Sequence, residues 1–546
     1  MHERAKQLIK QGEYLFGKKD VVDQLQQEIA ENFYPERATF TGSADLGTRF
    51  ADYLMSSYPV LARRELGSSF SGMLRPSGKV WAKPYLEDAT NSDNKWIERA
   101  GVIQRKSMYD RNSQFVRATK EGDHDFAAFG QCVISVELNK MRDGVLYRNW
   151  HLRDCAWSEG YDGAINANYR KWNPTATQLA EIFPKTVHQK VLDKLKNEPY
   201  CEVKCMHMVL PSESYQDGKP WNAPYVSIYL DIDNQTVLEE VPQHHFMYVI
   251  PRWQTVSGSQ YAFSPATIVA LPDARLIQAM TRVLLEAGEK AVDPPMIAVK
   301  EAVRDDINIF AGGVTWVDAA YDERLGEVLR PLTSDKSGIP LGMDMRDDTR
   351  KMIAEAFYLN KLNLPPQGDM TAFEVSQRIQ EYIRNALPLF EPMESEYNGA
   401  LCDVTFDLLL RNGAFGSMRD IPRSLLGKEI KFRFESPLQE AIEREKVQRF
   451  RESVDVVAIA AQLDPSVAIN LDVKTAFRDV LKAVGVPAKW IRDEDEADAM
   501  QAEQEQQKQA QEAMMAAAQG AQAVEMMGNA KQSVMNANNA ESSNAA

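Results

Sequence analysis

The sequence predicts a mainly helical α+β protein built from several domains. Apolar residues recur at helical spacing in the first 130 residues and again after residue 263. Between them, residues 131–262 hold short runs rich in β-branched and aromatic residues, bounded by Pro, Gly, Asn or Asp. With 546 residues, the chain is long enough for about three domains.

The N-terminal part is predicted to be helical. Two apolar runs precede Pro35, which stops the second run because proline has no N–H for a helix interior. The same pattern returns over 46–74 and ends at the turn Arg75-Pro76-Ser77-Gly78. The apolar positions of the first two runs are Leu8, Ile9, Leu15 and Phe16, then Val22, Leu25, Ile29 and Phe33.

Strands follow in the middle of the chain. The segment Asn173-Pro174-Thr175-Ala176-Thr177 should begin a short helix through Ile182 between two of them. The predicted strands are Cys132–Leu138, Glu202–Leu210, Tyr225–Ile232 and His245–Ile250.

Two striped helices then flank a mixed segment, 296–340. The first has Pro272 where a first-turn proline is tolerated and ends at Pro294-Pro295. The second covers about 344–362 and stops at Pro365-Pro366. The stripe of the first helix consists of Leu276, Ile277, Met280, Val283, Leu284, Ala287 and Ala291.

A third helix opens at Thr371, which forms a capping-box pattern with Glu374, and Pro388 and Pro392 should kink or break it. Beyond it we expect a strand at Ile430–Phe434 and helices to Trp490. The segment 491–546 holds 10 acidic and 3 basic residues and no aromatic residue. It therefore predicts frayed helix followed by disorder.

The charge balance argues against one class of function, tight binding of DNA. Lys and Arg total 63 against 78 Asp and Glu, giving a net charge of −15, which argues against tight DNA binding but not against a protein that DNA passes. Five cysteines in this length fit a reducing compartment. The chain shows neither an apolar run of 18 residues nor a signal core at Met1–Lys6, so we expect a cytosolic, soluble product without a membrane partner.

No catalytic, cofactor or metal site is predicted. Gly42–Arg49 approaches a phosphate loop but lacks the lysine and the preceding strand. Gly67–Gly72 lacks the second glycine of a nucleophile elbow and indicates a small-residue helix face. Cys201, Cys205 and His207 would share one strand face, but no second ligand pair stands at a useful spacing, so half-buried strand thiols are favoured over a metal site. Asp123-His124-Asp125 is interpreted as a solvated helix start.

Several segments keep a fixed order over residues 65 to 390. They are Glu65–Trp81, with small residues before a Pro-x-Gly turn; Asp125–Gly130 before Val133–Glu137; Leu152-Arg153-Asp154 with Asp162-Gly163; Val249–Trp253 with Tyr261, Ser264-Pro265-Ala266 and Leu271-Pro272-Asp273, continuing to Asp293-Pro294-Pro295; and Asp369–Val375 with Arg378. Together they resemble the portal, or head-to-tail connector, family of short-tailed bacteriophages.

The resemblance implies a portal-type fold, assembled as a twelve-fold ring around a channel for double-stranded DNA at one capsid vertex of the virion, after assembly in the host cytoplasm. Its partners would be further copies of the chain, the terminase packaging motor, a tail adaptor, and major capsid and scaffolding proteins. The implied division is a wing (1–264 and 363–437), stem helices (265–292 and 342–362), a clip (293–341), a crown (438–490) and the tail 491–546.

The resemblance also implies site residues. The turn after the second stem helix would be a channel loop, formed by Asn363, Leu364, Pro365, Pro366, Gln367, Gly368 and Asp369. Arg275, Arg282 and Lys361 are candidate phosphate contacts, with ordinary surface salt bridges as the alternative. An acidic channel would repel the DNA, so that the DNA would slide through the channel rather than bind to its wall.

Two other functions stay open at this point. A phosphate-handling enzyme would use Gly42–Arg49, and another virion ring component would be an adaptor or an internal scaffold. The short segment between two long helices favours the portal over the adaptor.

Overall fold

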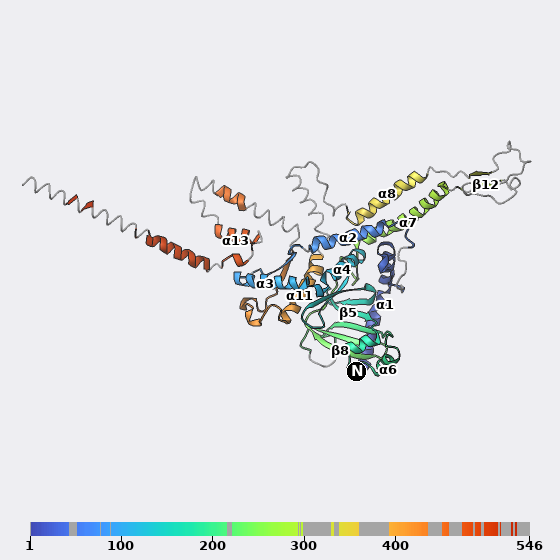
Figure 1. Ribbon diagram of the computed structural model, residues 1–546, viewed down its shortest axis with the longest axis horizontal. Coiled ribbons are helices and arrows are strands. Elements are labelled where there is room, and N and C mark those ends of the chain that lie inside the picture. Colours follow the sequence, from blue (N-terminus) through green and yellow to red (C-terminus); the bar gives the residue numbers. More distant parts are fainter. Residues whose placement is uncertain are drawn as a thin grey trace, which may run out of the picture. The chain divides into compact units, whose positions relative to one another are not determined.

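The computed structural model describes residues 2–42, 52–76, 78–87, 89–215, 221–292, 338–359 and 393–434, with shorter stretches between and beyond them up to residue 531. The chain forms two compact units. The first comprises Met1–Lys83, Val102–Gly416 and Phe432–Leu438, and the second comprises Pro84–Gly101, Ser417–Lys431 and Gln439–Ala546. The mainly helical α+β class predicted from the sequence is confirmed (Figure 1).

The N-terminal helices differ partly from the prediction. α1 (His2–Phe33) joins both apolar runs into one helix that ends before Pro35. α2 covers Tyr58–Leu74, so the predicted start at 46 is wrong for 52–57, which form turns and bends. Pro59 explains this start, because proline fits the first turn, where no partner for its missing N–H is needed.

Antiparallel sheets form the middle of the first unit. A five-stranded sheet has the order β4-β5-β6-β7-β8, and a three-stranded sheet has the order β3-β2-β9. Four of these strands, β3, β4, β5 and β8, were not among the predicted runs. The bounds are β2 Val133–Leu138, β3 Val145–Trp150, β4 Cys155–Glu159, β5 Ile165–Trp172, β6 Cys205–Pro211, β7 Tyr225–Asp231, β8 Thr236–Gln243 and β9 Tyr248–Val249.

The five-stranded sheet lies between helices (Figure 1). Leu8, Ile9 and Phe16 of α1 pack on the face that holds Met206 and Met208. The opposite face packs against α5 (Ala176–Ile182) and α6 (Gln189–Asn197). Thr175 caps α5 through a capping box with Gln178, which confirms the predicted helix start.

Among the remaining helices, α4 and α11 pack against the three-stranded sheet. Residues 394–399 form a π-helix that leads directly into α11. The bounds are α3 Asn91–Met108, whose first part belongs to the second unit, α4 Phe115–Phe129, α7 Pro265–Val292, α8 Gly338–Ala356 and α11 Ala400–Arg411.

Six short strands complete the part of the fold that the structure describes. β10 (Gln254–Thr255) pairs with β11 (Ala262–Phe263), and β12 (Met296–Ala298) pairs with β13 (Leu329–Pro331), both antiparallel. The remaining strands are β1 (Ala82–Tyr85) and β14 (Lys431–Phe434), the second of which agrees with the predicted strand at 430–434.

Two predictions about the long helices are wrong in detail. Pro272 lies inside α7, eight residues along a helix that begins at Pro265, and not in a first turn. The second helix begins at Gly338, with Pro340 in its first turn, and ends at Ala356. Tyr358 has a φ of 57°, a left-handed conformation that ends a helix. The predicted helix from Thr371 lies outside the described residues.

The second unit holds α13 (Val473–Ala483), a short 3₁₀ turn at Ala488–Trp490 and a helical stretch at 496–511. Asp93 accepts hydrogen bonds from Thr90 N (3.0 Å) and from the hydroxyl of Ser424. In the described part of the chain, no helix is both long and apolar enough to span a bilayer.

Candidate functional site: the α7–α8 helix pair

α7 and α8 lie side by side as an antiparallel pair whose far ends continue into the β12–β13 strand pair (Figure 1). Gly342 of α8 lies against Leu284 of α7. A Cβ atom on Gly342 would lie 2.7 Å from Leu284 Cδ2, so the absence of a side chain allows the close approach. The pair belongs to the first unit and contains two of the predicted site residues, Arg275 and Arg282.

The predicted apolar stripe of α7 is divided between two faces of the helix. Ile277 is fully buried, and Leu284 is half-buried against α8. Val269, Leu276 and Val283, spaced by seven residues, are 63%, 46% and 63% exposed. Seven residues are close to two helical turns, so these three side chains form one open apolar line.

α8 also presents an open apolar line, Leu341, Met345 and Met352, with each side chain at least half exposed. Three exposed carboxylates follow it, each three residues after an apolar member: Asp344, Asp348 and Glu355. Residues three apart are neighbours on a helix surface, so an apolar stripe and an acidic stripe run together along the outer side of α8.

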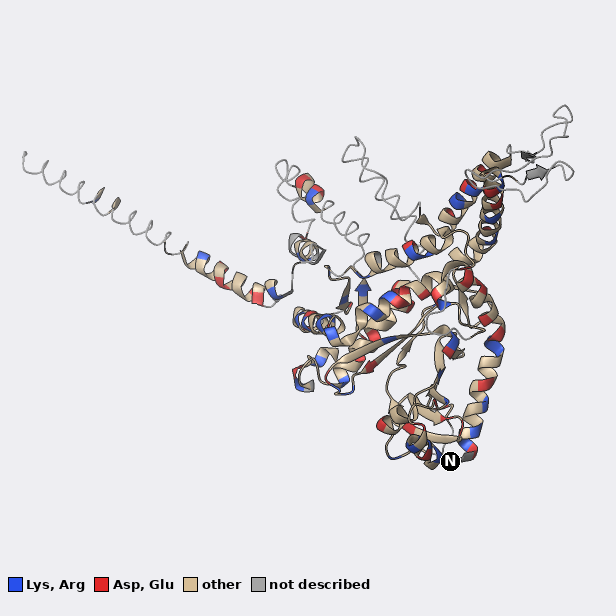
Figure 2. Ribbon diagram, turned by 45° about the vertical axis from the view of Figure 1, so that its right-hand side comes forward, with Lys and Arg blue, Asp and Glu red and all other residues tan. Residues whose placement is uncertain are grey.

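The charges of the pair are nearly balanced. α7 carries three acidic and three basic residues, and α8 carries four acidic and three basic residues, so their net charges are 0 and −1. Figure 2 shows the two signs interleaved along the helices. The acidic excess of the chain therefore lies elsewhere, and these two helices give no support to a strongly acidic bore.

The base of α7 is fastened to the end of α4. The hydroxyl groups of Ser264 and Thr267 donate to the carbonyl oxygens of Ala127 and Ala128, each at 2.8 Å. These carbonyls lie in the last turn of α4, where intrahelical partners are missing. Gly130 ends α4 with a φ of 71° and lies directly against the backbone of Phe263.

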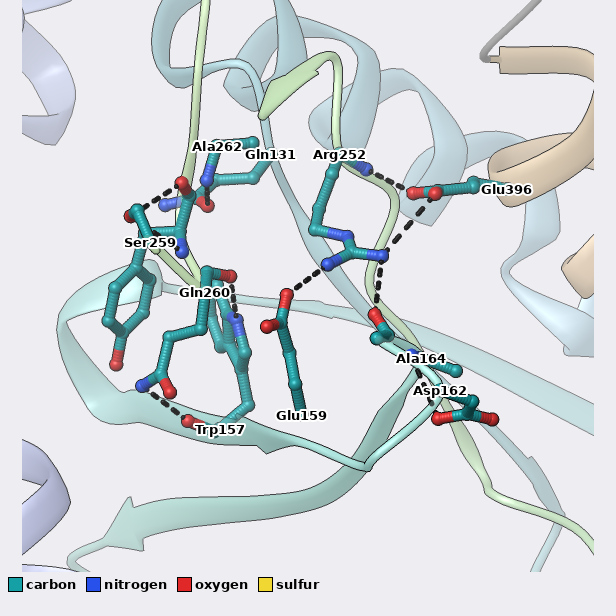
Figure 3. Close-up of polar contacts among 12 residues, drawn as sticks. Gln131, Trp157, Glu159, Asp162, Ala164, Arg252, Ser259, Gln260, Ala262 and Glu396 are labelled. Carbon is teal, nitrogen blue, oxygen red and sulfur yellow. Dashed lines mark hydrogen bonds and ion pairs between the residues drawn. The ribbon is translucent and has the colours of Figure 1, made fainter. Parts of the chain in front are cut away.

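Arg252 forms a second junction, shown in Figure 3. Its side chain binds Glu159 of β4 and the carbonyl oxygen of Gly163 (3.1 Å), and its backbone N–H donates to Glu396 Oε2 (3.0 Å). Nearby, Trp157 Nε1 donates to Gln260 O (3.1 Å), and Gln260 Nε2 donates to Trp157 O (2.8 Å). These contacts hold the chain that leads into α7 against the five-stranded sheet and the π-helix.

The Asp123-His124-Asp125 segment corrects the sequence interpretation. It lies within α4, and both carboxylates are buried rather than solvated. Asp123 pairs with Arg75, and Asp125 pairs with Arg37 through two bonds of 3.0 and 2.7 Å. The arginines come from the residues just after α1 and α2, so tertiary contacts bring the opposite charges together.

The predicted site residues are only partly brought together. Arg275 Nε donates to Glu28 Oε1 of α1 at 2.7 Å, which is the salt-bridge alternative. Arg282 is exposed on the same helix, whereas Lys361 and the loop 363–369 lie outside the described residues. Most of the segment Gly42–Arg49 also lies outside the described residues.

The cysteine–histidine segment does not form a metal site among the described residues, where no group of three His, Cys, Asp or Glu side chains is placed to hold an ion. Cys201 lies outside β6, which begins at Cys205, so the expected shared strand face is wrong. Both nitrogens of His207 are used, by Tyr248 Oη (2.6 Å) and Ser227 Oγ (2.8 Å). Burial lowers the pKa of His207 well below its usual value, so the ring is a neutral part of the sheet.

Sequence reasoning missed the residues that position the helix pair. Arg252 and Ser264 lie in segments that carry the family resemblance, which gave them no role. Nothing local marks these two residues, Thr267 or Glu396, because their partners are 89 or more residues away in the chain. A usable signal did exist for the buried ion pairs: two arginines within about one helical turn of a helix end, and two acidic residues on a helix rich in apolar side chains.

Comparisons with known proteins agree with the sequence resemblance. A family model described as "Bacteriophage head to tail connecting protein" matches residues 5–491. The chain is 24% identical over 458 residues to the "Probable portal protein" of Bordetella phage BPP-1, covering 79% of each chain. It is also 24% identical over 458 residues to the "Portal protein" of Salmonella phage epsilon15, covering 81% of this chain and 80% of that protein.

Two solved particle structures contain similar chains, with low TM-scores. One is the virion of a native gene transfer agent particle (TM-score 0.37, 10% identity, 78% of this chain and 94% of that chain). The other is the neck of an empty gene transfer agent particle (TM-score 0.35, 11% identity, 76% of this chain and 92% of that chain). TM-scores this low support no conclusion about the chain. The family assignment rests instead on the family model, which covers most of the sequence. The chain belongs to the family of bacteriophage head-to-tail connecting proteins, which are structural components of the virion.

Proposed function

We propose that this protein is a portal: a ring of identical subunits at one capsid vertex through which double-stranded DNA enters during packaging and leaves at infection. The observation that carries the proposal is the family match over residues 5–491. The names of the two phage relatives support it. The ring would be a dodecamer, and its partners would be the terminase motor, the tail adaptor, and the major capsid and scaffolding proteins.

The exposed apolar lines of the α7–α8 pair support an assembled state. Large aliphatic side chains that stand in rows on a surface are typical of an interaction site. In a closed ring, each subunit buries one side of such a pair against the next subunit through a heterologous contact. The helix pair would then line or surround the channel.

The division into wing, stem, clip and crown belongs to this proposal. α7 spans the residues proposed for the first stem helix, and α8 overlaps most of the second. The strand pair of Met296–Ala298 with Leu329–Pro331 lies within the proposed clip. The loop 363–369 is proposed as the channel loop, and Lys361 as a phosphate contact near it.

The test of the proposal is single-particle imaging of the purified full chain, together with mass photometry. Rings of about twelve subunits with a central hole would support the portal. A monomer at every protein and salt concentration would overturn it. A ring of another subunit number with a different channel shape would favour an adaptor or an internal scaffold.

A second experiment addresses the channel loop. Deleting 363–369 in a phage that can be complemented should leave ring assembly intact while packaged DNA falls or leaks. If the rings fail to assemble, the loop is a packing element and the channel-loop proposal is wrong.

A further inference from the structure

The outer sides of α7 and α8 carry exposed charged groups as well as their apolar lines. On α7, Arg275 and Arg282 are seven residues apart and form a row about 100° around the helix from Leu276 and Val283. On α8, Asp344, Asp348 and Glu355 run beside Leu341, Met345 and Met352. Glu286 on α7 and Lys351 on α8 add a charge of the other sign to each side, so Arg282 and Asp344 are the charges that the two sides can offer to each other.

We infer that these two sides are the complementary halves of one contact between neighbouring copies of the chain, in which Arg282 of one copy pairs with Asp344 of the next. The inference rests on the proposed ring. A heterologous contact needs two different surfaces that fit each other, and the α7 and α8 sides meet that requirement within a single chain.

The positions of the two residues along the helix axes, here called their heights, agree with this pairing. Leu284 lies against Gly342 within one copy. The helices are antiparallel, so a step toward the N-terminus of α7 and a step toward the C-terminus of α8 go in the same direction. Two residues from Leu284 and Gly342 in that direction, Arg282 is level with Asp344. Rotation about a ring axis leaves heights unchanged for helices that run along the axis, so the two residues stay level between neighbours. The same relation brings Val283 level with Met343, which is 46% exposed.

The existing contacts of the candidate residues favour Arg282 and Asp344 over their neighbours. Arg275 is already bound by Glu28, and Asp348 is paired with Lys351 at 3.0 Å. Asp347 pairs with Arg346 and Arg350. Arg282 and Asp344 are both exposed, and neither has an ion pair within 4 Å among the described residues.

DNA is the competing partner for Arg282. A phosphate contact requires a wet, cationic surface, whereas Arg282 lies on a helix with an open apolar line and no net charge. Glu286 follows four residues later, so a nearby carboxylate also opposes phosphate binding. A protein surface that combines apolar and acidic groups fits this helix better.

The test uses charge exchange in the full chain. Arg282→Glu and Asp344→Lys should each raise the concentration needed for ring assembly at least about tenfold, because each places like charges opposite each other. The double variant should restore assembly. An equal mixture of the two single variants should also restore it, through rings in which they alternate, since each contact then joins opposite charges.

The control is Lys190→Glu on α6, an exposed charge far from both helices in the chain, which should assemble like the unchanged protein. Circular dichroism confirms folding of each variant. If the unchanged protein forms rings and both single variants do so equally well, the inferred contact is wrong while the portal proposal stands. If Arg282→Glu rings assemble but retain less DNA, Arg282 is a phosphate contact instead. If the unchanged protein forms no ring, the proposed function itself fails.

Discussion

Arg75 and Asp123 form an ion pair inside the protein, with side chains that are only 3% and 1% exposed. Arg75 Nη1 also donates to Asn398 Oδ1 at 2.5 Å, and its guanidinium lies 4.6 Å from the ring centre of Tyr397. The pair therefore joins the end of α2, the middle of α4 and the π-helix before α11. Burial opposes the charge of Arg75, but the neighbouring Asp123 raises its pKa overall.

Removing one member of this pair should destabilise the protein strongly. Arg75→Met leaves a buried carboxylate without its partner, and the free energy of unfolding should fall by about 3–5 kcal/mol. Urea denaturation followed by tryptophan fluorescence measures the change. The matched control is Arg117→Met, which breaks an exposed pair with Glu121 on the same helix and should cost at most about 0.5 kcal/mol. Equal losses for both variants would contradict the structural role of the buried pair.

Gly67 determines how closely α2 approaches α4. A Cβ atom there would overlap the ring of His124, with the His124 backbone also only 3.3 Å away. Gly67→Ala should therefore lower the free energy of unfolding by about 1–3 kcal/mol through overpacking. Gly72→Ala lies on the same helix with nothing within 4 Å, and it should be neutral or stabilise by up to about 1 kcal/mol. Thermal unfolding of the two variants separates helix propensity from packing.

Gly130 combines a left-handed conformation with a close backbone contact. Gly130→Ala should destabilise the protein by more than the roughly 1–2 kcal/mol that a left-handed alanine costs, because its Cβ atom would overlap Phe263 at the base of α7. Gly163 has a similar φ of 76° with nothing within 4 Å, so Gly163→Ala should show the conformational cost alone. Chemical denaturation of both variants measures the difference, and a smaller loss for Gly130→Ala would show that the junction relaxes easily.

Histidine burial predicts a loss of stability in mild acid. Burial, reinforced by the charges of Arg63, Lys120 and Arg64, lowers the pKa of His124 from 6.5 to about 4. Between these pH values the imidazole of His124 binds a proton in the unfolded chain but not in the folded protein. The free energy of unfolding therefore falls as the pH drops. The slope from this one residue is up to about 1.4 kcal/mol per pH unit.

His124→Gln should remove that contribution and flatten the dependence of unfolding free energy on pH between 6.5 and 4. Denaturation midpoints measured across this range test it, with His244→Gln at an exposed position as the control. Burial also lowers the pKa of His151, to about 3, so part of the dependence should persist in the variant. An unchanged slope would mean that His124 is protonated in the folded protein.

The sequence alone determined the class of the protein and the positions of its clearest elements. Helical spacing and terminating prolines located α1 and α7, and β-branched runs located β2 and β7, because these signals act within a few residues of the chain. The order of short motifs indicated the family, which the match over residues 5–491 shows.

The tertiary structure decided the environment of each side chain. Asp123 and Asp125 have an ordinary helical sequence context, and only the packing of α1 and α2 on α4 buries them beside Arg37 and Arg75. The apolar stripe of α7 likewise looked uniform along the sequence. Packing on neighbouring helices buried Ile277, α8 covered part of Leu284 at Gly342, and Leu276 and Val283 stayed open. Local patterns record which residues are apolar or charged, whereas partners distant in the chain determine which of them are buried.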